Sequence, residues 1–164
     1  MIPRITTAAE RQRAAQHWLA CAAPVPRLVY RDWKNDGLAL LPAGVLFAVV
    51  ALSAAEVHAA ARTDQPTRVN RYLSRVLGGP VFCYDSFEAY FAMVPAGTAR
   101  GWNLSDVPCL GLGQTVAVPR PGLTREDGTR AFWAVQMDSP ALLCEPNLVA
   151  HLILTGRRRG ATCG

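Results

Sequence analysis

Lysine is nearly absent from this sequence: Lys34 is the only one, and the other strongly basic side chains are all arginines. Charged residues of either sign are scarce, at 18%, while hydrophobic residues make up 51% of the 164 positions. Disorder requires low hydrophobicity and high charge, so this composition excludes a disordered chain and predicts one domain with one core. The net charge of +5 permits attraction to phosphate groups, although it is modest for a whole surface.

Motifs for disulfides, metals and covalent catalysis are missing as well. The cysteines are odd in number and form no CxxC pair; they are Cys21, Cys83, Cys109, Cys144 and Cys163. We expect inert thiols in a reducing cytoplasm. The histidines are expected in helical segments, each without an acidic or cysteine neighbour in motif spacing; they are His17, His58 and His151. There is no GxSxG or GxxxxGK motif, and so the sequence predicts no metal, no cofactor and no catalytic constellation.

Neither a secretory signal nor a membrane span is expected. Arg4 and Arg11 lie where a signal peptide needs its apolar core. The run 38–55 carries no charge, and its eighteen residues just reach the length of a spanning helix. Pro42 and Gly44 interrupt that run, so we expect buried strands there, in a cytoplasmic protein.

Hydrophobic periodicity predicts a single α+β domain with a mixed or mainly antiparallel sheet flanked by helices. Helices are expected at 8–21, 53–61, 67–77 and 147–154, with a further helix start near 138. Strands are expected at 38–41, 45–52, 81–84, 89–94, 114–119 and 131–136. We assign residues 1–156 to this domain and 157–164 to a basic, flexible tail.

Two of the predicted helices begin with a capping box, in which a Ser or Thr and a Glu three residues later bond each other's backbone N–H groups. Thr7 with Glu10 and Ser53 with Glu56 have this spacing. Residues 27–36 are polar and aromatic, and we interpret them as a loop or short helix.

The apolar strands at 38–41 and 45–52 are separated only by Pro42-Ala43-Gly44. Because both runs are rich in branched residues and a turn signal lies between them, we expect a hairpin buried on both faces at the centre of the sheet. Residues 120–130 are polar and are expected to project as a second hairpin tip.

Arginines gather in two places. One group shares a face of the helix at 67–77, away from its apolar stripe: Arg68, Arg71 and Arg75. The other opens the expected tail: Arg157, Arg158 and Arg159. Each phosphate that an arginine neutralises releases counterions, so both groups are candidate contacts to DNA or RNA. The alternative is a solvated helix face and a solubilising tail.

Acidic residues do not form a two-metal site. Such a site needs two or three converging carboxylates, and none of the twelve acids lies in the middle of an apolar strand. Asp85 and Glu88, at a strand end, are the nearest pair and would be the first candidates in an enzyme. We favour a protein without catalytic activity.

The stretch Ala39-Leu40-Leu41-Pro42-Ala43-Gly44-Val45-Leu46-Phe47-Ala48-Val49-Val50-Ala51-Leu52 resembles part of the N-terminal catalytic domain of bacterial bifunctional DNA primase/polymerases. Two later stretches, 79–98 and 114–119, also resemble strands of that domain. The resemblance implies a primase-polymerase-like fold, with metal-binding aspartates on the second strand and a histidine on a later strand pair.

This chain departs from the family at those functional positions. It has Ala48, Val50 and Leu52 where the second strand should present aspartates, and Glu88-Ala89-Tyr90-Phe91 where the histidine is expected. Without the acids, the two-metal mechanism has no ligands. The resemblance therefore implies a degenerate member that kept the fold and lost polymerase chemistry.

Three functions remain open at this point. The first is a catalytically inactive binding module, acting on nucleic acid or on a protein partner in replication or regulation. The second is a small interaction or assembly protein that uses exposed apolar surface, with a homo-oligomer as one form of it. The third is an enzyme with a repositioned acidic site at Asp85 and Glu88.

Overall fold

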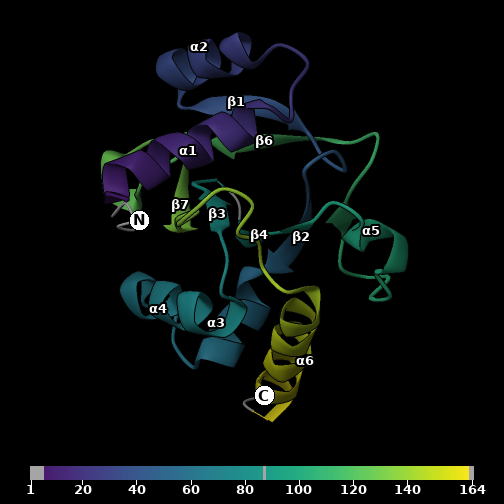
Figure 1. Cartoon of the computed structure of the whole chain (residues 1–164). Helices are drawn as coiled ribbons and strands as arrows, with labels where there is room; N and C mark the ends of the chain where they lie inside the picture. The colour runs from purple at the N-terminus through teal and green to yellow at the C-terminus, as the bar shows by residue number, and fades with distance from the viewer. Residues whose placement is uncertain (1–5, 87, 163–164) are drawn as a thin grey trace, which may run out of the picture.

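A five-stranded antiparallel sheet forms the middle of three layers (Figure 1). The structure is a computed structural model that describes residues 6–86 and 88–162. The strands are β1 (Leu38–Pro42), β2 (Phe47–Ser53), β3 (Val81–Tyr84), β4 (Ala89–Pro95), β5 (Cys109–Leu110), β6 (Thr115–Pro119) and β7 (Ala131–Val135). The helices are α1 (Ala8–Ala20), α2 (Pro26–Asp36), α3 (Ala54–Ala61), α4 (Pro66–Leu77), α5 (Thr98–Gly101) and α6 (Pro146–Thr162), with a 3-10 turn η1 (Arg125–Asp127).

The main sheet has the order β5-β2-β4-β3-β7, and β1 and β6 form a separate two-stranded sheet. All of the strand pairs are antiparallel. Helices α3, α4 and α6 cover one face of the main sheet, while α1, α2 and the β1–β6 sheet cover the other. The expected single α+β domain, with antiparallel sheets flanked by helices, is confirmed.

Strand β2 is buried on both faces of the main sheet, which explains its unbroken apolar sequence. Its side chains alternate because successive residues of a strand point to opposite faces. Ala48, Val50 and Leu52 belong to the core beneath α3, α4 and α6. Phe47 and Val49 belong to the second core, beneath α1 and α2. The two-sided burial predicted for this segment is therefore confirmed.

The expected hairpin between β1 and β2 is wrong, because the two strands lie in different sheets. β1 pairs with β6, with Leu40 opposite Ala117, whereas β2 pairs with β4 and β5. The chain changes direction at Gly44, whose φ of +84° suits glycine and where any side chain would overlap the backbone of Leu112. Leu40 is 68% exposed, so β1 is covered on one face only.

The helix starts follow the sequence signals unevenly. Thr7 and Glu10 form the predicted capping box of α1, with N–H to oxygen distances of 2.8 and 3.1 Å. Ser53 occupies the N-cap of α3, but its side chain makes no capping hydrogen bond. Residues 27–36 are helical within α2, which begins at Pro26 and ends at a left-handed Gly37.

The C-terminal part of the chain differs most from expectation. No helix begins near 138; α6 instead starts at Pro146 and continues to Thr162. The assignment of a flexible tail is therefore wrong for residues 157–162, and 163–164 lie outside the described residues. Arginines in the last turns favour this extension, because cations stabilise the negative end of a helix.

The segment 120–130 is not a hairpin tip, because β6 and β7 belong to different sheets. It folds back over the core instead. Leu123 is buried, and its carbonyl accepts the backbone N–H of Trp133 at 2.9 Å. The indole N–H of Trp133 donates to the carbonyl of Arg120 at 3.1 Å.

The uncharged run 38–55 forms β1, β2 and the first residues of α3. Within the described part of the chain, no helix combines the length and the apolar character needed to cross a bilayer.

Helix α6 crosses α3 at very short range, and Gly156 makes this possible. A Cβ atom at Gly156 would overlap the carbonyl oxygen of Glu56 on α3. At Gly160, one turn later, a Cβ would make an ordinary contact of 3.8 Å with the Cβ of Ala59. The close approach of the two helices therefore requires a glycine at 156 but not at 160, a difference that the sequence alone does not indicate.

We predict that Gly156→Ala lowers the free energy of unfolding by about 1–3 kcal/mol, because the backbones must separate. The matched substitution Gly160→Ala should be neutral, or stabilising by up to about 1 kcal/mol through helix propensity. Thermal denaturation of both variants beside the parent protein measures this. Equal melting temperatures for the two variants would contradict the assigned crossing point.

Candidate nucleic-acid interface

Helix α4 separates an apolar face from a basic one, as its sequence predicts. The helix begins where the side chain of Gln65 accepts the backbone N–H of Arg68 at 3.0 Å. The buried stripe is Val69, Leu73 and Leu77. The exposed face carries Arg68, Arg71 and Arg75. These three arginines are thus held together by helical spacing and point to solvent.

The three arginines line a cleft of about 280 Å³, which we call the α4 cleft. Arg62 and Tyr72 also line it. The guanidinium of Arg75 lies 5.8 Å from the centre of the Tyr72 ring. In the stretches 6–86 and 88–162, no carboxylate forms an ion pair with any of the four cleft arginines. The cleft therefore holds four arginines that form no ion pair with any carboxylate of the described residues.

Arg62 is a member of this cleft that sequence reasoning missed. It caps the C-terminus of α3 in the left-handed conformation, with φ 58° and ψ 31°. Glycine or asparagine usually occupies such a position, because a side chain there costs about 1 kcal/mol. Because the sequence has no glycine at the end of α3, it contains no signal that identifies Arg62 as the C-cap of this helix. The left-handed backbone places Arg62 where its side chain lines the cleft.

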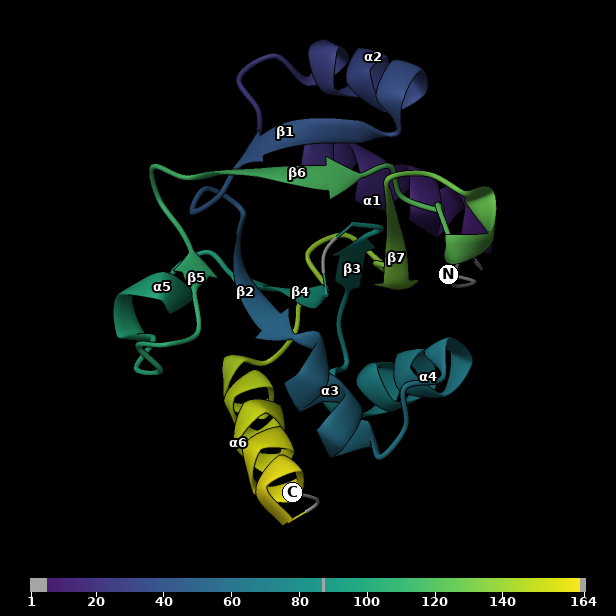
Figure 2. The same ribbon diagram turned by 180° about the vertical axis from the view of Figure 1, so that it is seen from behind.

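A second cleft, which we call the α3–α6 cleft, has a volume of about 530 Å³. Its charged and polar lining consists of His58, Arg62, Arg159 and Thr162. Arg159 donates a hydrogen bond from its guanidinium to the carbonyl of Ala60, near the end of α3. Since α3 lies between α4 and α6 (Figures 1 and 2), the two clefts flank α3 and share Arg62.

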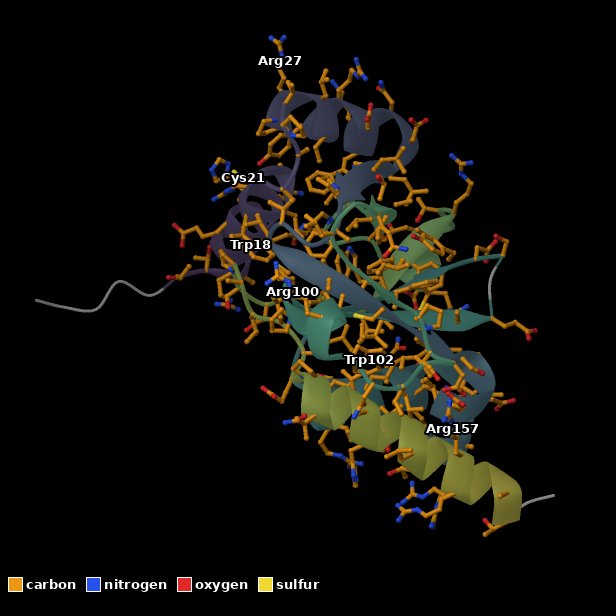
Figure 3. The ribbon with its side chains drawn as sticks, turned by 90° about the vertical axis from the view of Figure 1, so that its right-hand side faces the viewer. Trp18, Cys21, Arg27, Arg100, Trp102 and Arg157 are labelled. Atoms are coloured by element: carbon orange, nitrogen blue, oxygen red, sulfur yellow. The ribbon has the colours of Figure 1, made fainter. Side chains whose placement is uncertain are left out.

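The other two arginines of the expected tail have different surroundings. Arg157 donates to Glu56 at 2.9 Å and to Asp106 at 2.6 Å, and its side chain lies where α6 meets the rest of the domain (Figure 3). The hydrogen bond to Glu56 is the main reason that the pKa of Arg157 is raised. Arg158 is exposed and lines neither cleft. The structure thus places Arg159 in the α3–α6 cleft, which shares Arg62 with the α4 cleft, whereas Arg157 joins α6 to Glu56 and Asp106.

Asp85 and Glu88 line a third cleft, of about 150 Å³, beside His58, Tyr90 and Arg125. Both carboxylates are exposed. The Nε2 atom of His58 lies 3.0 Å from the hydroxyl of Tyr90. Burial raises the pKa of Tyr90 to about 12, so the phenol is neutral at physiological pH.

Metal ligation finds no support in this third cleft. Among the residues that the structure describes, no three His, Cys, Asp or Glu side chains gather as a metal would require. Cys83 lines this cleft, and burial raises the pKa of its thiol to about 12. A neutral thiol is a poor nucleophile, so the groups assembled here suit polar binding better than covalent chemistry.

The cysteines differ in exposure. Cys21 is exposed, and its sulfur lies 3.7 Å from Nε2 of His17, a pair that the i, i+4 spacing could have revealed. Cys109 is half-buried. Cys83 and Cys144 are buried, and burial raises the pKa of each to about 12.

In a Cys163→Ser background at pH 8, we predict prompt reaction of Cys21 with a thiol reagent and slower reaction of Cys109. Cys83 and Cys144 should react only when the protein opens, since a pKa near 12 leaves roughly one thiol in ten thousand ionised at that pH. Thiol titration of native and denatured protein provides the test. Prompt labelling of Cys83 in the native protein would contradict the prediction.

In comparisons with known proteins, no family model, curated protein or solved structure matches this chain. The resemblance to primase/polymerase domains therefore stays a prediction.

Proposed function

We propose that this protein is a nucleic-acid-binding module without polymerase activity, and that it binds the phosphate backbone in the α4 cleft. The observation that supports the proposal best is the grouping of four uncompensated arginines around one cleft. The opposite ends of the exposed face, Arg68 and Arg75, are separated by seven residues, or about 10 Å along the helix axis. Arginines spread over that length can contact more than one phosphate of a strand at once.

Charge repulsion adds to this argument. Four like charges around one cleft repel each other, and nothing in the described chain neutralises them by an ion pair. A phosphate chain removes this repulsion and releases its own counterions, so binding becomes favourable and sensitive to salt. Guanidinium groups also suit phosphate oxygens, because they donate two parallel hydrogen bonds.

The proposal that the protein lacks polymerase activity is supported by the burial of the three positions where the family resemblance requires aspartates. Ala48, Val50 and Leu52 are at most 1% exposed and pack beneath α3, α4 and α6. A carboxylate pair there would be buried in an apolar core without water or partners, at a high energetic cost. We therefore propose a degenerate primase-polymerase-like domain in which helices close over the face that would hold the metals.

We predict that the triple variant Arg68→Glu, Arg71→Glu and Arg75→Glu loses binding to labelled oligonucleotides at low salt. In the parent protein, the affinity should fall steeply as salt rises, and these three arginines should account for roughly 2 to 3 units of the logarithmic slope. Fluorescence anisotropy across a salt series measures both quantities.

The matched control changes the same net charge on the opposite layer of the molecule. Arg13, Arg27 and Lys34 are exposed on α1 and α2, and Arg27 points away from the body of the protein (Figure 3). Their triple replacement by Glu should leave most of the affinity in place. If both triple variants lose binding equally, only net charge matters and the α4 cleft is not the site.

A second candidate function is self-association or docking of a protein partner, and one observation favours it. Val45 and Leu112 are 52% and 76% exposed, and the backbone of Leu112 packs against Gly44, next to Val45. Two exposed apolar side chains on adjoining loops are typical of a small contact surface.

If this surface mediates self-association, the sedimentation coefficient of the parent protein should rise with concentration. The double variant Val45→Ser and Leu112→Ser should then sediment as a monomer, with stability nearly unchanged because both side chains are exposed. A monomeric parent protein at every concentration would remove the support for this candidate.

A further inference from the structure

The α4 cleft and the α3–α6 cleft meet at Arg62, which lines both. Arg68, Arg71 and Arg75 lie on one side of this residue, and Arg159 lies on the other. The basic surface therefore continues around the C-terminal end of α3 rather than stopping at α4. We call this continuous surface the arginine track.

The backbone at the end of α3 sets the position of Arg62. The N–H groups of Arg62 and Thr63 donate to the carbonyls of Ala59 and His58, at 3.3 and 3.2 Å, which closes the last turn of the helix. The left-handed conformation of Arg62 then reverses the chain toward α4. A glycine would adopt this conformation with less strain, so arginine at this position lowers the stability relative to glycine.

Each half of the track also contains a ring. Tyr72 lines the α4 cleft and His58 lines the α3–α6 cleft, and both side chains are half-buried. Alternation of arginines with rings is typical of surfaces that bind single strands, where phosphates contact the cations and unstacked bases stack on the rings.

Shape favours the same ligand. A duplex is a stiff rod with a persistence length of about 50 nm, and its bases are stacked inside. It can contact arginines on one side of α3, but it cannot turn around the end of an eight-residue helix and enter a second cleft. A single strand is flexible enough to follow both clefts.

From the shared Arg62, the two rings and the turn around α3, we infer that the arginine track selects single-stranded nucleic acid over duplex, with Arg62 as the contact that joins its two halves. This inference rests on the proposed function and specifies the class of its ligand. It also assigns Arg159 to the interface through the second cleft, while Arg157 and Arg158 stay outside it.

The test compares a labelled single-stranded oligonucleotide with the same strand annealed to its complement, using fluorescence anisotropy at low salt. The full-length protein should bind the single strand at least about tenfold more tightly than the duplex. Arg62→Gly should weaken single-strand binding about tenfold, the effect of losing one charge-assisted contact. Because glycine suits the left-handed position, the melting temperature of this variant should equal or exceed that of the parent protein.

Tyr72 provides an independent readout of stacking. Tyr72→Ala should weaken single-strand binding roughly tenfold, whereas Tyr72→Phe keeps the ring and should preserve most of the affinity. Arg27→Ala removes one exposed charge from the opposite layer and should leave single-strand binding nearly unchanged.

The outcomes separate the two proposals. Equal affinity for single strand and duplex would overturn the inference and leave the proposed function in place. A preference for single strands that Arg62→Gly and Tyr72→Ala do not change would overturn the assignment of the track. Failure to bind either oligonucleotide at low salt would overturn the proposed function itself.

Discussion

Strand β2 has apolar side chains on both faces of the main sheet, and neither face is stable in contact with water. Both faces of the main sheet must therefore be covered by other elements, and the arrangement of the remaining helices and strands follows from this requirement. On one side the cover consists of α1, α2 and the β1–β6 sheet, and on the other it consists of α3, α4 and α6. β1 contributes to the first cover because it lies in a separate sheet with β6 and does not pair with β2.

The second cover also creates the candidate site. Helices α3 and α6 cross closely because Gly156 lets the backbone of Glu56 approach, and Arg157 fastens the pair through Glu56 and Asp106. Helix α4 buries its apolar stripe beside them and turns its arginines outward. The clefts lie on the two sides of α3, so the surface that we propose for nucleic acid is a consequence of how the helices cover the sheet.

The same packing explains why acid chemistry is not supported at the positions that the family resemblance indicates. Ala48, Val50 and Leu52 are part of the core that holds the helical cover in place. The described acids lie elsewhere, and two of them, Glu56 and Asp106, neutralise Arg157. Among the described residues, the arginines of α4 have no such ion-pair partner, and this difference distinguishes the surface that we propose for binding from the structural contact of Arg157.

The sequence by itself determined the local structure of the chain. The spacing of apolar residues located β3, β4, β6, β7 and α4 within a residue or two, and it placed Arg68, Arg71 and Arg75 on one exposed face. These features depend on residues close together in the chain, where the periods of helix and strand apply directly.

Only the tertiary structure decided which strands pair, how far α6 extends and which arginines meet. An apolar run has the same sequence whichever strand lies beside it, so the separation of β1 from β2 was not predictable from periodicity. Arg157 and Arg159 are two residues apart, yet one pairs with carboxylates and the other joins the α3–α6 cleft. Arg62 belongs to the proposed interface because its left-handed backbone and its neighbours on α4 and α6 place it between two clefts. Such contacts join distant parts of the chain, and they exist only once the packing of the helices has brought those parts together.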